Sequence, residues 1–240
     1  NEVRGMAEQI FGPLKPNPAL TQRVRPTEPE HRAPRRVELK DPRAGRTMVT
    51  RAYLAPSYNT AAAGEAEALD LLMKIVADGG TSRLYQRLVV DKKVATSAGG
   101  WYSGSGLDYG EIRVSGVVAD GSSIPAVEAA IDEVLAEVKR DGVTAEELDR
   151  AKKAYVAAYI YETDNQMTLA RRYGWGITAG RTIAQIDAWP DEIAKVTLDQ
   201  IKAAANKNLI LNRSVTGTLI PEAAPTAPAA QPAASAQRRS

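Results

Sequence analysis

The sequence predicts an α+β fold, a two-layer sandwich in which helices pack on one face of a mixed or antiparallel sheet. Strand-like and helix-like segments follow the order ββ-αα-ββ-αααα-β, which lacks the regular alternation of a parallel α/β fold. The composition supports one sizeable core, because 44% of the 240 residues are hydrophobic and 25% are charged.

Residues 1–12 are predicted to form the last helix of a preceding domain. Apolar residues recur at helical spacing from Val3 to Ile10, and Gly12-Pro13 ends the pattern, because proline cannot extend a helix. Residues 13–34 contain six prolines and few apolar side chains, which predicts an extended linker. Because the chain starts without Met and within the helical pattern, we expect a fragment of a longer precursor.

The main domain is predicted to span residues 35–220. Its strands are the segments rich in β-branched and aromatic residues that end near proline, glycine or serine: residues 36–40, 47–55, 94–102, 109–118 and 214–219. Its first two helices, 61–77 and 82–90, are separated by Gly79-Gly80, which interrupts the helical pattern.

Two later helices are predicted to begin with a capping box, in which two side chains bond to amides that would otherwise lack partners. Thr144 with Glu147 opens one of these helices, and Thr197 with Gln200 opens the other. The helix before them, 124–140, is predicted from its apolar period.

Residues 221–240 are predicted to be disordered. They contain eight alanines, four prolines and no large apolar side chain, so they cannot bury enough surface to offset the entropy lost on ordering. No apolar run in the chain approaches the roughly 18 residues that span a membrane.

The composition excludes several kinds of active site. Without cysteine there is no disulfide, thiolate metal site or cysteine nucleophile. The single histidine, His31, lies in the predicted linker, and one histidine is too few for an ordinary zinc site or for a Ser-His-Asp triad in the main domain. Adjacent carboxylates are interpreted as solvated or helix-capping pairs: Asp132-Glu133, Glu146-Glu147 and Asp191-Glu192.

A nucleic-acid partner is not expected. The net charge of +2 supplies no general attraction for a polyanion. Residues 171–175 (RRYGW) mix cations with aromatic rings, but we interpret them as helix surface with aromatic residues in the core.

Beyond these patterns, residues 79–88 (GGTSRLYQRL) resemble the GG-x-S-R-L-[FY] signature in the C-terminal domains of pitrilysin-like zinc peptidases. The resemblance extends to the strand ending Tyr53 to Pro56, to the Thr144-x-Glu-Glu-Leu helix start and to the opening Ile10-Phe-Gly-Pro-Leu, and covers residues 1–220. It implies that an N-terminal peptidase domain of the same protein precedes the linker.

In this family the zinc ligands belong to the N-terminal domain, as an H-x-x-E-H motif with a further glutamate. The present chain lacks the two histidines of that motif. The resemblance therefore implies that this chain has no catalytic residue, no metal ligand and no cofactor of its own. Zinc would be held by the missing upstream domain, where it would polarise the scissile carbonyl while the motif glutamate activates water.

Many C-terminal domains of the family also carry an Arg, and seven positions later a Tyr, that contact substrate near the zinc. Val89 and Thr96 occupy these two positions here, and neither supplies the charge or the phenol. In bacterial two-subunit members, one chain carries the zinc motif and its partner carries the Arg/Tyr pair. The resemblance thus implies the zinc-bearing type, which forms a heterodimer with a second family subunit.

Three residues are candidate contacts to a peptide substrate: Trp101, Tyr102 and Arg83. The two aromatic residues lie on the strand after the lost pair and could line the chamber, although aromatic residues on a sheet are more often packing residues. Arg83 could instead bond to neighbouring backbone at a helix start.

We expect this chain to be the C-terminal half of a zinc metallopeptidase that encloses peptides and is inactive alone. Two alternatives stay open: a non-catalytic structural or assembly subunit of the same family, and a plain α+β interaction domain. A periplasmic location is expected, since two-subunit bacterial members are often exported and the Ala/Pro tail resembles those of envelope proteins. A cytoplasmic location is the alternative.

Overall fold

The computed structural model describes residues 2–21, 24–26, 29 and 31–222. The chain forms two compact units, Asn1–Glu30 and His31–Ser240. The first contains helix α1 (Glu2–Phe11), in which no residue is buried. Most of the predicted disordered tail lies outside the described residues, while its first residue, Pro221, belongs to a strand.

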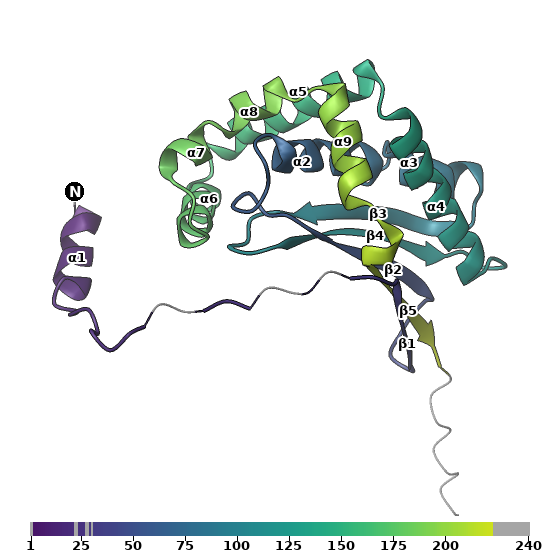
Figure 1. Ribbon diagram of the computed structural model, residues 1–240, viewed down its shortest axis with the longest axis horizontal. Helices are drawn as coiled ribbons and strands as arrows, with labels where there is room; N and C mark the ends of the chain where they lie inside the picture. The colour runs from purple at the N-terminus through teal and green to yellow at the C-terminus, as the bar shows by residue number, and fades with distance from the viewer. Residues whose placement is uncertain (1, 22–23, 27–28, 30, 223–240) are drawn as a thin grey trace, which may run out of the picture. The chain divides into compact units, whose positions relative to one another are not determined.

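The second unit is built on a mixed sheet with the strand order β1-β5-β2-β4-β3 (Figure 1). The strands are β1 (Arg35–Asp41), β2 (Met48–Ala55), β3 (Ala95–Ser103), β4 (Gly110–Val118) and β5 (Ser214–Pro221). The pair β1 and β5 is parallel, and the other neighbouring pairs are antiparallel. The predicted α+β class is therefore confirmed, and the last strand of the described chain lies between the first two.

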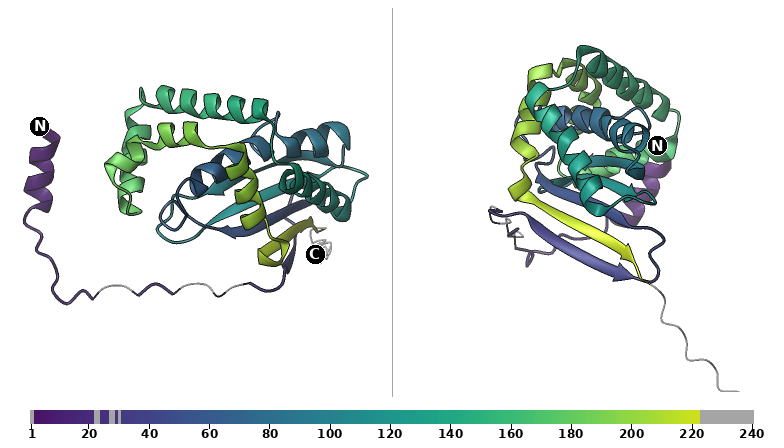
Figure 2. Two further views of the ribbon diagram at one scale, coloured as in Figure 1. Left: turned by 45° about the horizontal axis from the view of Figure 1, so that its top comes forward. Right: turned by 90° about the vertical axis from the view of Figure 1, so that its right-hand side faces the viewer.

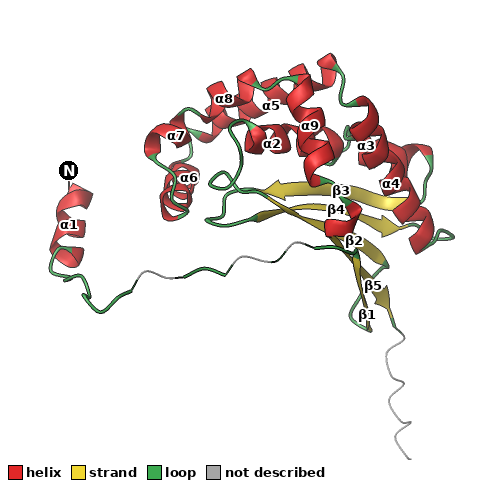
Figure 3. Ribbon diagram, viewed as in Figure 1, coloured by secondary structure: helices red, strands yellow, loops and turns green. Residues whose placement is uncertain are grey.

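The helices lie on one face of this sheet (Figures 2 and 3). They are α2 (Glu65–Val76), α3 (Arg83–Tyr85), the π-helix η1 (Gln86–Asp91), α4 (Ile124–Asp141), α5 (Ala145–Glu162), α6 (Gln166–Thr178), α7 (Ile183–Asp187), α8 (Trp189–Lys195), α9 (Leu198–Asn208) and the 3-10 helix η2 (Leu211–Arg213). Alternating side chains of β2, such as Val49 and Tyr53, are buried beneath the helices. The side chains between them point to the other face, called here the open face.

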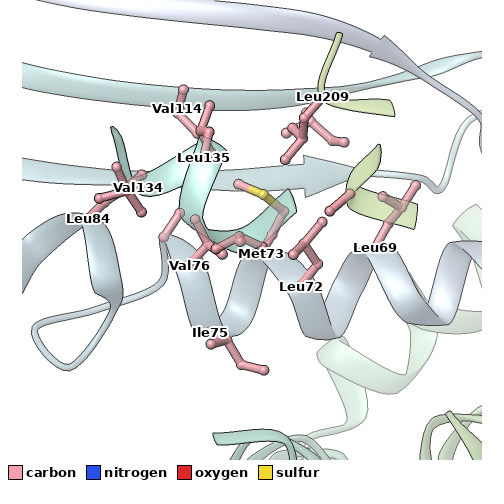
Figure 4. Close-up of a cluster of buried hydrophobic side chains, with 14 of the residues drawn as sticks. Leu69, Leu72, Met73, Ile75, Val76, Leu84, Val114, Val134, Leu135 and Leu209 are labelled. Carbon is pink, nitrogen blue, oxygen red and sulfur yellow. The ribbon is translucent and has the colours of Figure 1, made fainter. Parts of the chain in front are cut away.

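Helix α2 is the centre of the core. Buried side chains of α2, β4 and α4 meet on the sheet side of this helix (Figure 4). Ile75 points away from that cluster, to the opposite side of α2, and is only 5% exposed. A helix buried on two sides lies inside the molecule, not at its surface.

Helix α5 packs against α2 and α8 and lies beyond α2 from the sheet (Figure 1). Only Leu148 and Ala151 of α5 are buried, so its apolar surface is too narrow for a helix that covers a sheet. No helix of the described residues is long and apolar enough to cross a membrane.

Candidate functional site

The described part of the chain does not fit a zinc ion. No three His, Cys, Asp or Glu side chains of the described residues come together as a metal-binding group. His31 lies at the start of the second unit, where its Nδ1 is 2.9 Å from Nη2 of Arg35. A zinc site needs three or four such ligands.

The two positions that the resemblance assigns to the substrate-binding Arg and Tyr lie at backbone irregularities. Val89 belongs to η1, where the amide of Lys92 donates to the carbonyl of Arg87 at 3.0 Å, a π-type bond. Thr96 is the extra residue of a β-bulge, because its neighbours Ala95 and Ser97 pair with adjacent residues of β4. Both irregularities are frequent at functional sites, because they re-aim side chains.

The π-helix was not predicted. The sequence predicted an ordinary helix over residues 82–90, and the structure turns after three α-helical residues into the wider π-turn. The apolar period of such a short segment does not distinguish the two kinds of turn.

Trp101 and Tyr102 are placed on opposite faces of β3, as neighbours on a strand must be. Tyr102 faces the helices, and its hydroxyl donates to the carbonyl of Pro56 at 2.6 Å. Trp101 lies on the open face, is 48% exposed, and holds its ring 5.2 Å from the guanidinium of Arg113. Of the two aromatic candidates, Trp101 is therefore the accessible one.

The third candidate, Arg83, binds carboxylates within the domain. Its Nε and Nη2 donate to Glu147 at 2.8 and 2.6 Å, and Glu137 lies 3.6 Å from Nη1. Glu147 also accepts the amide of Thr144 at 2.7 Å, so the predicted capping box is present. Burial alone would raise the pKa of Glu147, but the hydrogen bonds from Arg83 and Thr144 hold it below its ordinary value.

Four of the six adjacent carboxylates form ion pairs, a role that the interpretation as solvated or helix-capping pairs did not include. The partners are Arg51 for Asp132, Lys92 and Arg87 for Glu133, Arg83 for Glu147, and Lys195 for Glu192. None of these pairs places two carboxylates as an acid and a base on either side of one site.

One polar cluster was not found from the sequence. The hydroxyl of Tyr58 donates to the carboxylate of Asp70, and the indole Nε1 of Trp189 donates to the same hydroxyl at 2.5 Å. Burial raises the pKa of Asp70 to about 7, although the bond from Tyr58 opposes the shift. The three residues are separated by 12 and 119 positions in the chain (70 − 58 and 189 − 70), so no local motif signals them.

The aromatic interpretation of residues 171–175 is corrected in one respect. Trp175 was expected in the core but is 66% exposed on α6. Tyr173 is half-buried, and its hydroxyl donates to Asp187 at 2.7 Å. The reason is that α6 packs against the short helix α7 and not against the sheet.

Of the predicted aromatic site residues, Trp101 is the one whose side chain is accessible on the open face. Trp101 with Arg113 offers an aromatic and cationic surface to a chain that passes over the open face. Such a surface can contact a peptide.

Residues 1–155, more than half of the chain, match a family described as the peptidase M16 inactive domain. No curated protein matches the chain. Among solved structures, a protease from Helicobacter pylori is 20% identical with a TM-score of 0.79. The match covers 92% of this chain and 52% of that one.

Two further solved structures share the fold. The peptidase M16 inactive domain from Pseudomonas fluorescens is 19% identical with a TM-score of 0.72, covering 92% of this chain and 50% of that chain. The periplasmic protease PqqL from Escherichia coli is 16% identical with a TM-score of 0.72, covering 92% of this chain and 25% of that chain. The present chain thus spans about half the length of the Helicobacter and Pseudomonas proteins.

Proposed function

Because the chain belongs to the M16 peptidase family, as its inactive-domain type, we propose that it is the C-terminal, non-metal-binding half of a zinc metallopeptidase. Such an inactive domain implies an N-terminal peptidase domain as its partner. We propose that the upstream domain supplies the zinc motif, and that the two halves enclose a peptide substrate whose chain passes over Trp101.

Two observations carry this proposal: the match to the inactive-domain family, and the lack of a three-ligand metal group among the described residues. The described residues build a complete sheet-and-helix domain of the inactive type, yet offer no three-ligand metal group. A zinc peptidase needs at least three protein ligands and an open coordination position. The length of the Helicobacter and Pseudomonas relatives, about twice the matched part, supports a second domain of similar size.

We further propose that the whole protein forms a heterodimer with a second family subunit. Val89 lies in the π-turn and Thr96 at the bulge. They lack the guanidinium and the phenol that the family resemblance assigns to these two positions. A partner that carries both groups would complete the site. If the upstream domain lacks the zinc motif, the same fold would serve as a non-catalytic assembly subunit.

The domain organisation and the compartment belong to the same proposal. Residues 1–12 would end the N-terminal peptidase domain, residues 13–34 would be the linker, and residues 35–220 the inactive domain. A periplasmic location is supported by the description of the Escherichia coli relative as periplasmic.

The test compares zinc content and cleavage of a quenched fluorescent peptide for the 240-residue chain, the full-length protein, and the full-length protein with its partner subunit. We expect neither zinc nor cleavage for the 240-residue chain, one zinc per full-length protein, and cleavage only when the partner is added. Stoichiometric zinc and cleavage by the 240-residue chain would refute the proposal. A full-length protein without zinc would establish the non-catalytic alternative.

A gain-of-function variant tests the dependence on a partner. Val89→Arg with Thr96→Tyr in the full-length protein should raise cleavage in the absence of the partner, because both substrate-binding groups are restored at their positions. The matched control is Val90→Arg with Ser97→Tyr, which places the same groups one residue further along. Equal activities of the two double variants would argue against these positions.

A further inference from the structure

A cavity of about 320 Å³ opens among the helices of the second unit, away from β3 and η1. It lies between α5, α6, α7 and α8, which gather on one side of the helical layer (Figure 1). Its walls combine three aromatic rings with three cations: Tyr155, Tyr159, Trp189, Lys74, Arg172 and Arg181. Alanine and isoleucine side chains and the carboxylate of Glu162 complete the lining. The volume and the mixture of apolar, aromatic and charged groups are those of a small-molecule site.

Two aromatic side chains of the cavity form hydrogen bonds to residues that do not line it. Nε1 of Trp189 donates to the hydroxyl of Tyr58 at 2.5 Å, and the hydroxyl of Tyr155 donates to the carbonyl of Asp70 at 3.2 Å. Trp189 stacks on Tyr159 with ring centroids 5.7 Å apart and meets Tyr155 edge-on at 5.6 Å. Because these polar atoms bond to protein groups, Trp189 and Tyr155 present apolar ring surface to the cavity, while the Tyr159 ring is also contacted by Trp189 and the guanidinium of Arg172.

Two of the three cations already have an acidic partner. Lys74 is 2.5 Å from Asp78, and Arg172 is 2.7 Å from Glu162 while its guanidinium lies over Tyr159. Arg181 differs, because no described carboxylate lies within salt-bridge distance of it, although its charge favours the ionised form of Asp70. It donates to the carbonyl of Gln185 at 2.9 Å and lies 4.4 Å from the centre of the Tyr58 ring.

We propose that this cavity binds an apolar carboxylate, with the acid group at Arg181 and the apolar body against Trp189 and Tyr159. A guanidinium offers several donors and binds a carboxylate through two parallel hydrogen bonds, which explains the choice of an acid over a neutral group. The C-terminal residue of a peptide and a free arylalkanoate share this chemistry. The inference is independent of the proposed peptidase function, since it uses none of the residues near β3.

The test titrates the 240-residue protein with N-acetyl-L-phenylalanine, N-acetyl-L-phenylalanine amide and 3-phenylpropionate, followed by the indole N–H signals in NMR. The protein has three tryptophans, so Trp101 and Trp175, outside the cavity, are internal references. We expect the Trp189 signal to shift alone, and the acid to bind at least tenfold more tightly than its amide. Equal binding of acid and amide would overturn the proposal.

The two acids identify the source of the ligand. If N-acetyl-L-phenylalanine binds more tightly than 3-phenylpropionate, the site is selective for a peptide C-terminus. If both bind equally, the site accepts apolar carboxylates in general. Either result supports the shared chemistry.

Variants of Arg181 test whether the ligand's carboxylate binds at this residue. Arg181→Gln should weaken binding of N-acetyl-L-phenylalanine about tenfold and remove its advantage over the amide, whereas Arg181→Lys should restore part of the affinity. Arg171→Gln is the matched control, an exposed arginine of α6 that does not line the cavity. Unchanged affinity in a folded Arg181→Gln protein would contradict the assignment, as would an equal loss in the control.

Discussion

At the residue scale, Arg83 joins the start of α3 to the start of α5, because it binds the glutamate that also completes the α5 cap. Arg83→Gln is expected to lower the free energy of unfolding at pH 7 by about 1–3 kcal/mol, since both side chains are largely buried and the bonds are charge-assisted. Urea denaturation of both proteins at pH 7 measures the difference.

The same pair predicts a pH dependence. The folded protein holds the pKa of Glu147 below its ordinary value, so the ionised pair stabilises the fold above the unfolded pKa of about 4.3 and loses this effect as the pH falls through the lowered pKa. The stability difference between wild type and Arg83→Gln should therefore shrink in acid. Lys153→Gln, which removes a well-exposed ion pair, is the control and should cost less than about 0.5 kcal/mol.

Asp70 has the opposite dependence on pH. Its pKa in the folded protein is about 7, chiefly through burial and further through the charge of Glu67, while Tyr58, Trp189 and Arg181 favour the ionised form. The unfolded chain ionises near pH 4, so folding becomes less favourable between about pH 4 and pH 7.

Asp70→Asn should remove this cost while its amide oxygen still accepts the Tyr58 hydroxyl. We expect the free energy of unfolding of the variant to rise relative to that of wild type by up to about 1.4 kcal/mol for each pH unit between pH 5 and pH 6. Urea denaturation at each pH measures the difference. The difference should level off above pH 7, once Asp70 is ionised in both states. A difference independent of pH would contradict the raised pKa.

At the scale of elements, local signals predicted helix starts well. The capping boxes at Thr144 and Thr197 are both present, because they depend only on side chains within one turn. A third box, Thr182 with Gln185, opens α7 and carries the same signal, which the sequence interpretation missed. The helices α6 to α8 have few buried residues, so their apolar period is weak.

Contacts between distant segments could not be predicted in this way. The Tyr58, Asp70 and Trp189 cluster and the aromatic cavity depend on how α2, α5 and α8 pack, which no local pattern encodes. The exposure of Trp175 has the same cause, since a tryptophan on a helix is buried only if another element covers that side.

The pairing of β3 with β4 requires glycine where the two backbones approach closely, as at Gly100. A Cβ atom at Gly100 would lie 2.1 Å from the carbonyl oxygen of Arg113 on β4, so Gly100→Ala must separate the two strands. We expect a loss of about 1–3 kcal/mol in thermal or urea unfolding. Gly217→Ala in β5 is the matched control, because the nearest atom would be 4.0 Å away, and it should change stability little.

At the scale of the whole molecule, the helices of the second unit cover one face of the sheet, and no described helix of that unit covers the other (Figure 2). The edge strand β1 leaves Val37 and Leu39 more than half exposed, and Trp101 is half exposed at the other edge. Apolar side chains left exposed at the two edges of this face are available to contact another domain. This arrangement agrees with the proposal that the domain forms the wall of a larger enclosure.

Helix α2 connects the sheet to the outer helices α5 and α8, so a change in its core side chains should affect both layers. Leu72 is fully buried among residues of this core, so Leu72→Ala should cost about 2–5 kcal/mol, as a cavity replaces close packing. The urea midpoint should fall with an unchanged slope, and far-UV and near-UV circular dichroism should report one transition, since α5 and α8 depend on the same helix. Leu211→Ala, at a side chain that is 48% exposed, is the control. Two separate transitions in the Leu72→Ala protein would mean that the outer helices fold independently of the sheet.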